Sequence, residues 1–158
     1  MRNLEALNAF LLPGLFLYFW LDSGAGVGWL WRLPPMVLGS CLLLQGAAYW
    51  HQKLRRIRHR RRMSPGWRTG FARLRILNRL LLGGWFLAML AGFISGWSWA
   101  DAAWSIGLWL FALGEYVNYF EVQLMHDTPN DLARLSRNRR LRRAHLVRDL
   151  DAAPPDVT

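Results

Sequence analysis

Two long apolar segments dominate the chain, and each is followed by a basic segment. Residues 6–50 contain only two Asp, Glu, Lys or Arg side chains, and residues 80–125 contain only three. Each segment is long enough for two helices of about 20 residues, the length that crosses the hydrocarbon core of a bilayer. The pattern therefore predicts an all-α polytopic membrane protein, a bundle of four transmembrane helices. The four expected spans cover residues 7–21, 29–50, 80–97 and 102–125.

The segments between and after the spans predict further helix near the membrane surface. The second helix is expected to continue through residues 51–62 until Pro65 and Gly66 break it, since these two residue types punctuate helices. Apolar residues then recur at helical spacing between arginines, which predicts an amphipathic surface segment before the third span. We expect a four-helix membrane domain at 1–126, with a basic cytoplasmic loop at 51–79, and a basic cytoplasmic tail helix with a frayed end at 127–158.

The basic residues are segregated along the chain. Eighteen of the twenty Lys and Arg residues lie in residues 53–79 and 134–148. Basic residues flank the cytoplasmic ends of spans, and an even number of spans places the loop, the tail and the N-terminus on one side. The charge pattern therefore predicts an N-in, C-in topology, with the bacterial inner (cytoplasmic) membrane as the location. Many of the ten Trp residues fall at the ends of the expected spans, as they do in aromatic belts.

A second interpretation of the N-terminus is a secretory signal peptide over residues 1–25. Arg2, the apolar stretch and the small residues at 23–26 resemble one, whereas Glu5 and Asp22 fit it poorly. Cleavage would leave three spans and an external N-terminus. N-terminal sequencing of the purified protein distinguishes the two interpretations.

The third span carries small residues at every fourth position. Small residues at this spacing let helix backbones approach closely, as in tandem GxxxG patterns. We expect this helix to be central in the bundle or at a homodimer face. The stripe consists of Gly84, Ala88, Gly92 and Gly96.

The fourth span contains Glu115, about 16 Å from either end of the expected helix at 1.5 Å per residue. An ionisable side chain at that depth is costly, so it is either protonated or partnered, and it marks a candidate site. Other polar residues of the cytoplasmic half are expected near its level. They form either a hydrogen-bonded network that holds the bundle together, or a small-ion or lipid-headgroup site. The expected polar cluster under Glu115 consists of Asn8, Gln45, Tyr49, Arg79, Asn118 and Glu121, with Arg79 paired to Glu121.

The arginines of the loop and the tail exceed what topology requires. The surplus predicts contact with anionic lipid headgroups or with an acidic protein partner. Nucleic acid is disfavoured because the tail lacks aromatic residues for base stacking. The expected contact residues are Arg55, Arg56, Arg58, Arg60, Arg61, Arg62, Arg137, Arg139, Arg140, Arg142 and Arg143.

Catalytic and metal-binding motifs are absent from the sequence. No G-x-S-x-G, C-x-x-C or Walker loop occurs, and Cys41, the single cysteine, suits a small core residue better than a nucleophile. The four histidines form no close pair, so we expect no metal and no cofactor.

The C-terminal third resembles small four-helix bacterial integral membrane proteins that have no assigned activity. The resemblance rests on a Glu-Tyr-x-Asn-Tyr segment, Glu115-Tyr116-Val117-Asn118-Tyr119, followed by a basic tail through Arg142-Arg143-Ala144-His145 to Leu150. It implies the four-helix membrane fold and no reaction. The small multidrug transporters also have four helices, but their essential buried Glu lies in the first helix, where this chain has no carboxylate.

These observations favour a non-enzymatic inner-membrane scaffold or accessory subunit. Its arginine-rich cytoplasmic face would engage anionic lipid or an acidic partner, and a homo-oligomer is compatible with the small-residue stripe. A proton-coupled carrier that uses Glu115 is the second hypothesis. A lipid-modifying enzyme, with Arg79 on a phosphate and Glu121 or His126 as base, is the third.

Overall fold

The computed structural model describes residues 2–22, 28–59, 63–124 and 141–151. For residues 2–6, 8–10, 20, 22 and 29 it describes the backbone only. The described residues form helices and no strand, so the all-α prediction is confirmed. The helices are α1 (Arg2–Asp22), α2 (Trp29–His59), α3 (Pro65–Ile94), α4 (Trp99–Phe120) and α6 (His145–Asp151).

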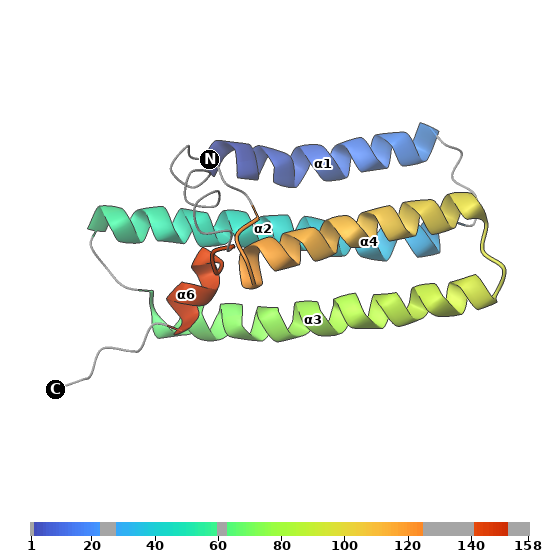
Figure 1. Ribbon diagram of the computed structural model, residues 1–158. Helices are drawn as coiled ribbons and strands as arrows, with labels where there is room; N and C mark the ends of the chain where they lie inside the picture. Colours follow the sequence, from blue (N-terminus) through green and yellow to red (C-terminus); the bar gives the residue numbers. More distant parts are fainter. Residues whose placement is uncertain (1, 23–27, 60–62, 125–140, 152–158) are drawn as a thin grey trace.

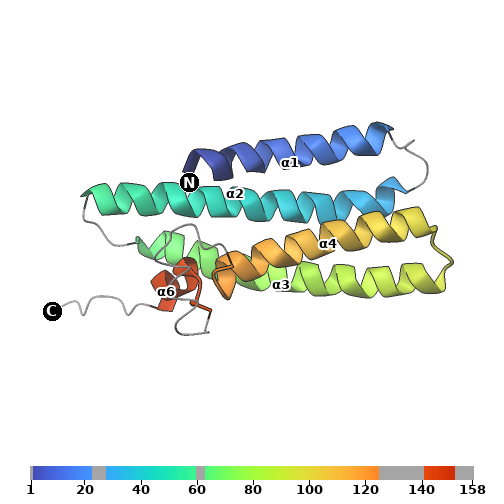
Figure 2. The same ribbon diagram turned by 45° about the horizontal axis from the view of Figure 1, so that its top comes forward.

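The four long helices lie side by side and alternate in direction (Figures 1 and 2). One end of the bundle contains His59, Pro65 and α6, and we call it the arginine end. The opposite end contains Trp31, Trp97 and the start of α4, and we call it the tryptophan end. Helices α2 and α4 form the most extensive packing, α1 lies on α2, and α3 lies mainly on α4. The short helix α6 packs against α3 and α4 at the arginine end.

Local sequence signals set the ends of α3 and α4. Ser64 is the N-cap residue of α3 in extended conformation, and Pro65 follows at the first helical position, where its missing N–H costs nothing. Gly96 ends the segment after α3 with φ of 78°, a conformation that favours glycine. Ser98 caps α4 by accepting a hydrogen bond from the backbone N–H of Asp101 at 3.1 Å.

Two glycines of α2 allow its close approach to α4. A Cβ added to Gly39 would lie 3.0 Å from the Phe111 ring, and one added to Gly46 would overlap the Tyr119 ring. The seam therefore depends on residues without side chains at these two positions. The core around it consists of Leu38, Leu42, Tyr49, Met63, Phe71, Leu82, Ala112, Tyr116, Tyr119, Phe120 and Leu146.

The small-residue stripe expected to form a helix seam does not form one with the other described helices. A Cβ at Gly84 would meet nothing within 4 Å, and Gly96 lies beyond the end of α3. Gly92 is buried, but against the Trp97 side chain that follows its own helix. The expectation of a central α3 is therefore wrong, because the close approach is made by Gly39 and Gly46 of α2. The homodimer interpretation of the stripe stays a prediction.

One described helix, α3, is long and apolar enough to cross a membrane by length and composition. This supports one of the four expected spans and leaves the four-span arrangement unsupported by that criterion. The expected span at 80–97 and the surface segment before it form one continuous helix, so much of the expected loop at 51–79 is helical. The expected start of the tail helix lies outside the described residues.

Candidate functional site

The polar contacts of the arginine end join four helices, and the largest group surrounds Glu121, which follows the last residue of α4. Arg79 lies 2.6 Å and Arg75 3.1 Å from its carboxylate oxygens. The Tyr116 hydroxyl donates to Glu121 Oε1 at 2.9 Å. Arg79 Nε in turn donates to the Tyr116 hydroxyl oxygen at 2.5 Å. Two guanidiniums thus face one carboxylate, and the Arg79 side chain is 53% exposed.

A second contact connects α2 with α3. Asn78 Nδ2 donates to Gln45 Oε1 at 2.8 Å, and Gln45 Nε2 donates back to Asn78 Oδ1 at 3.4 Å. Asn78 is only 2% exposed. Reciprocal bonding satisfies both amides, which a buried amide requires. The pair therefore fixes the spacing of α2 and α3 near the Glu121 group.

A third group holds α6 against α2. The Tyr49 hydroxyl donates to Asp149 Oδ2 at 2.8 Å, and Arg56 lies 3.2 Å from the same oxygen. Lys53 Nζ donates to the Tyr49 oxygen at 3.1 Å. Burial, together with the positive charge of nearby arginines, lowers the pKa of Lys53, while Asp149 opposes that shift. Asp149 thus ties α6 to α2, and Arg68 of α3 donates to the Leu150 carbonyl oxygen of α6 at 2.7 Å.

The residues of the expected polar cluster do not form a single layer in the structure. Arg79 and Glu121 lie together, but Gln45 and Tyr49 belong to the two other groups. Asn118 Oδ1 accepts from the backbone N–H of Leu124 at 2.9 Å. Glu115 is half-buried and makes no hydrogen bond or ion pair with a described residue. The Asn8 side chain lies outside the described residues.

The expected lipid-contact arginines are only partly described. Arg55 and Arg58 are exposed on the last turns of α2. Arg142 is half-buried, and Arg143 pairs with Asp151 at 2.8 Å on the surface. Arg56 is half-buried and pairs with Asp149 at 3.2 Å. The other six members, Arg60, Arg61, Arg62, Arg137, Arg139 and Arg140, lie outside the described residues.

The sequence analysis missed the ion pair of the tryptophan end. Arg32 and Asp101 lie 2.8 Å apart, and Ser98 donates to the second carboxylate oxygen at 2.7 Å. The Arg32 guanidinium also lies 5.8 Å from the centre of the Trp104 ring. The sequence did contain a signal for this pair. Arg32 and Asp101 are isolated charged residues, and each lies near the end of an expected span on the same side of the membrane.

The described residues offer little for catalysis or metal binding. No three of their His, Cys, Asp or Glu side chains are close enough together to hold a metal ion. Glu121 already accepts from Arg75, Arg79 and Tyr116, which leaves it poorly suited to act as a base. His126, the other base of the enzyme hypothesis, lies outside the described residues.

Comparison with known proteins adds no assignment. No protein family, no curated protein and no solved structure matches this chain. Functional inference therefore depends on the geometry and the charge distribution of the chain itself.

Proposed function

We propose that this chain is a multi-pass bacterial inner-membrane protein, a non-enzymatic scaffold or accessory subunit whose arginine end binds anionic lipid. In this arrangement the four long helices cross the bilayer, and the arginine end with both termini faces the cytoplasm.

The exposed faces of the helices support the membrane assignment. Large apolar side chains are exposed along all four long helices, among them Leu15, Leu30, Leu87 and Leu110. Extended exposed apolar surface is typical of membrane or partner contact and atypical of soluble monomers. Helices α1, α2 and α4 include Trp, Tyr or Pro residues that lower mean hydropathy, yet Trp and Tyr favour the bilayer interface.

The charge difference between the two ends is the observation that carries the lipid assignment. The described residues of 53–79 and 121–151 contain eleven Lys and Arg against three Asp and Glu. At the tryptophan end, Arg32 and Asp101 neutralise each other. Each cation near an anionic leaflet contributes about 1 kcal/mol of attraction. A surplus of this size at one end favours a surface that gathers anionic headgroups.

The lipid preference of the full-length protein in nanodiscs tests the proposal. Electron paramagnetic resonance with spin-labelled phosphatidylglycerol and phosphatidylcholine compares the two lipids at the protein surface. We expect phosphatidylglycerol to be preferred at low salt, with the preference lost at about 1 M salt, where the Debye length is about 3 Å.

Variants identify the source of that preference. The double variant Arg55→Gln/Arg58→Gln should reduce the preference by about half, and the matched Arg55→Lys/Arg58→Lys should retain it, since attraction to a leaflet depends on charge. Equal association of both lipids with the unmodified protein would refute the proposal.

A second candidate function rests on Glu115 alone. A half-buried carboxyl in α4 with no partner among the described residues suits reversible protonation, as in a proton-coupled carrier. Proton flux into proteoliposomes under an imposed gradient, abolished in Glu115→Gln with unchanged folding, would favour this function over the scaffold.

A further inference from the structure

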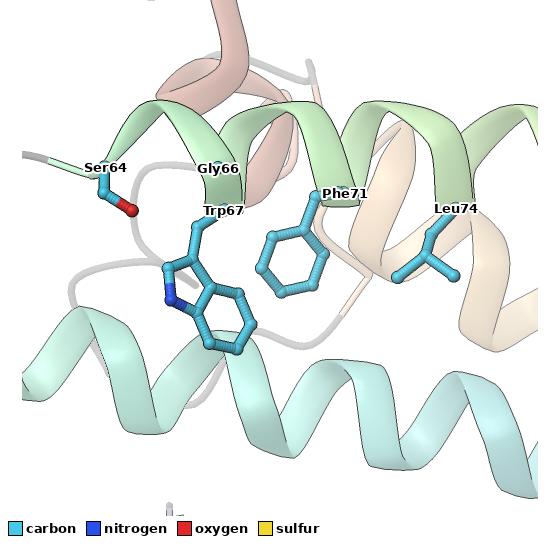
Figure 3. Close-up of a pocket in the computed structure, with 6 residues that line it drawn as sticks. Ser64, Gly66, Trp67, Phe71 and Leu74 are labelled. Carbon is cyan, nitrogen blue, oxygen red and sulfur yellow. The ribbon is translucent and has the colours of Figure 1, made fainter.

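An apolar pocket of about 370 Å³ lies along the first turns of α3 (Figure 3). Trp67 and Phe71 point from α3 toward α2 and form its wall, with Leu74 one turn further. At Gly66 and Gly70 the surface carries no side chain, and a Cβ at either position would meet no atom of the described residues within 4 Å. The pocket is thus a groove with apolar walls, and no side chain of the described residues covers its glycines.

A second pocket of about 340 Å³ adjoins the first and has a basic lining. It is lined by Gln52, Arg55, Arg56 and His59 near the end of α2, and by Met63, Ser64 and Trp67. Neither Arg55 nor His59 forms an ion pair with a described residue. The Nε atom of Arg56 is buried and has no hydrogen-bond partner in the described part of the chain.

The two pockets share Ser64 and Trp67, so they lie next to each other, and together we call them the bipartite site. Ser64 is the N-cap residue of α3, but its side chain makes no capping hydrogen bond and is free to contact a ligand. Trp67 is 42% exposed, and an amphipathic ring of this kind favours the level of the lipid headgroups. A ligand that fills the site needs an anionic group and an apolar chain joined at the level of Trp67.

We propose that this site binds one anionic phospholipid, with the phosphate against Arg55, Arg56 and His59 and an acyl chain over Gly66 and Gly70. This inference rests on the proposed function, since it requires the arginine end to lie at an anionic leaflet. The inference adds one defined lipid-binding site to the general attraction between the arginine end and an anionic leaflet. A free phosphate would contact the basic pocket but leave the apolar groove empty. An acidic peptide would also bind through its charge alone and would make no use of the groove.

Photolabelling of the full-length protein tests the site. The protein is reconstituted in phosphatidylcholine nanodiscs with a trace of phosphatidylglycerol that carries a photoactivatable diazirine on its acyl chain. After illumination, the labelled residues are identified by peptide mass spectrometry. We expect adducts on the peptide that contains residues 64–74. Unlabelled phosphatidylglycerol should compete for them, whereas phosphatidylcholine and glycerol phosphate should compete at least about tenfold less well, since the site selects for both halves of the ligand.

Two matched glycine variants separate the site from the surrounding lipid. Gly70→Leu fills the groove, and we expect it to reduce adducts at least about fivefold by steric exclusion. Gly83→Leu places the same side chain on the same helix, again where a Cβ meets no atom within 4 Å, and should leave labelling unchanged. Both variants replace a helical glycine, so neither is expected to unfold α3. Thermal unfolding of each variant checks this directly.

The outcomes distinguish the site from the broader function. Unchanged labelling in Gly70→Leu, with a persistent spin-label preference for phosphatidylglycerol, would overturn the site and leave the proposed function standing. Competition by glycerol phosphate as strong as that by the phospholipid would overturn the acyl part of the proposal. Loss of labelling in Gly70→Leu without any spin-label preference would support the site and overturn the wider lipid surface.

Discussion

The arginine end and the tryptophan end of the bundle handle charge in opposite ways. At the tryptophan end, the Arg32 side chain is 10% exposed and Asp101 is 19% exposed, and each is the other's counterion. The Trp104 ring centre lies 5.8 Å from the Arg32 guanidinium, and the Trp31 and Trp97 ring centres at the same end of the bundle are 4.4 Å apart. At the arginine end, Glu121, Asp149 and Asp151 each pair with arginine, yet the exposed Arg55 and Arg58 pair with no carboxylate of the described residues.

The difference separates charged residues that stabilise the fold from charged residues that the fold does not require. A buried pair must be complete, because removing one partner leaves an uncompensated charge in a medium of low dielectric constant. Exposed cations have no such requirement and cost little when removed. Charge at the tryptophan end therefore serves the fold, whereas the surplus at the arginine end is where we propose that anionic lipid binds.

The largest expected effect follows from breaking the pair of the tryptophan end. Asp101→Ala removes the carboxylate that lies 2.8 Å from the partly buried Arg32 guanidinium and should lower the free energy of unfolding by about 3 kcal/mol. Asp151→Ala, which removes the exposed partner of Arg143 at the other end, should cost under about 1 kcal/mol. Thermal or denaturant unfolding in detergent measures both. Similar losses of unfolding free energy in the two variants would contradict the proposed difference between the two ends.

An intermediate effect is expected for Glu121, whose partners are partly exposed. Glu121→Gln keeps the side-chain volume but removes the charge that faces Arg75 and Arg79, and should cost about 2 kcal/mol, the range for hydrogen bonds to charged groups. Tyr116→Phe removes one hydroxyl from the same group and should cost about 1 kcal/mol. The same unfolding assay ranks them, and a larger loss in Tyr116→Phe would contradict the assignment of Glu121 as the centre of the group.

The smallest effect concerns pH and His145 of α6. Burial, followed by repulsion from Lys53, Arg142 and Arg148, lowers the pKa of His145 below its ordinary value of 6.5, while Asp149 opposes the shift. The unfolded chain therefore takes up the proton first as the pH falls. The stability that neutral His145 contributes is complete above about 6.5 and is lost as the pH falls from there toward the lowered pKa.

Melting temperatures at neutral and mildly acidic pH measure this loss. His145→Phe retains a ring near Trp50, which lies 5.7 Å from His145 between ring centres, and should flatten the dependence between pH 6.5 and the lowered pKa. An unchanged slope in His145→Phe would assign the acid sensitivity to groups other than His145.

Much of the helical framework was predictable, and the sites were less so. Apolar length indicated the four long helices, and the break at Pro65 and Gly66 was visible. The seam was misplaced because Gly84 and Gly92 match a known spacing. By contrast, Gly39 and Gly46 are seven residues apart and match no such pattern. Their role in the seam becomes visible only in the structure, where Phe111 and Tyr119 lie against them.

The candidate site shows the same limit. The Arg79–Glu121 contact was expected from the estimated depths of the two residues, because spans of known length place residues along one axis. Depth says nothing about direction around the helix, so the roles of Arg75, Asn78 and Asp149 were not foreseen. The pocket at Trp67 requires two helices and their separation, which no single segment encodes.

The sequence by itself determined the helical class, the approximate helix lengths and the segregation of charge, because these depend on residue type and spacing along the chain. The tertiary structure alone decided which small residues form the seam, which carboxylate each arginine meets and where a bipartite pocket remains. Those features depend on the rotation of each helix about its axis. That rotation is set by packing between residues far apart in the sequence.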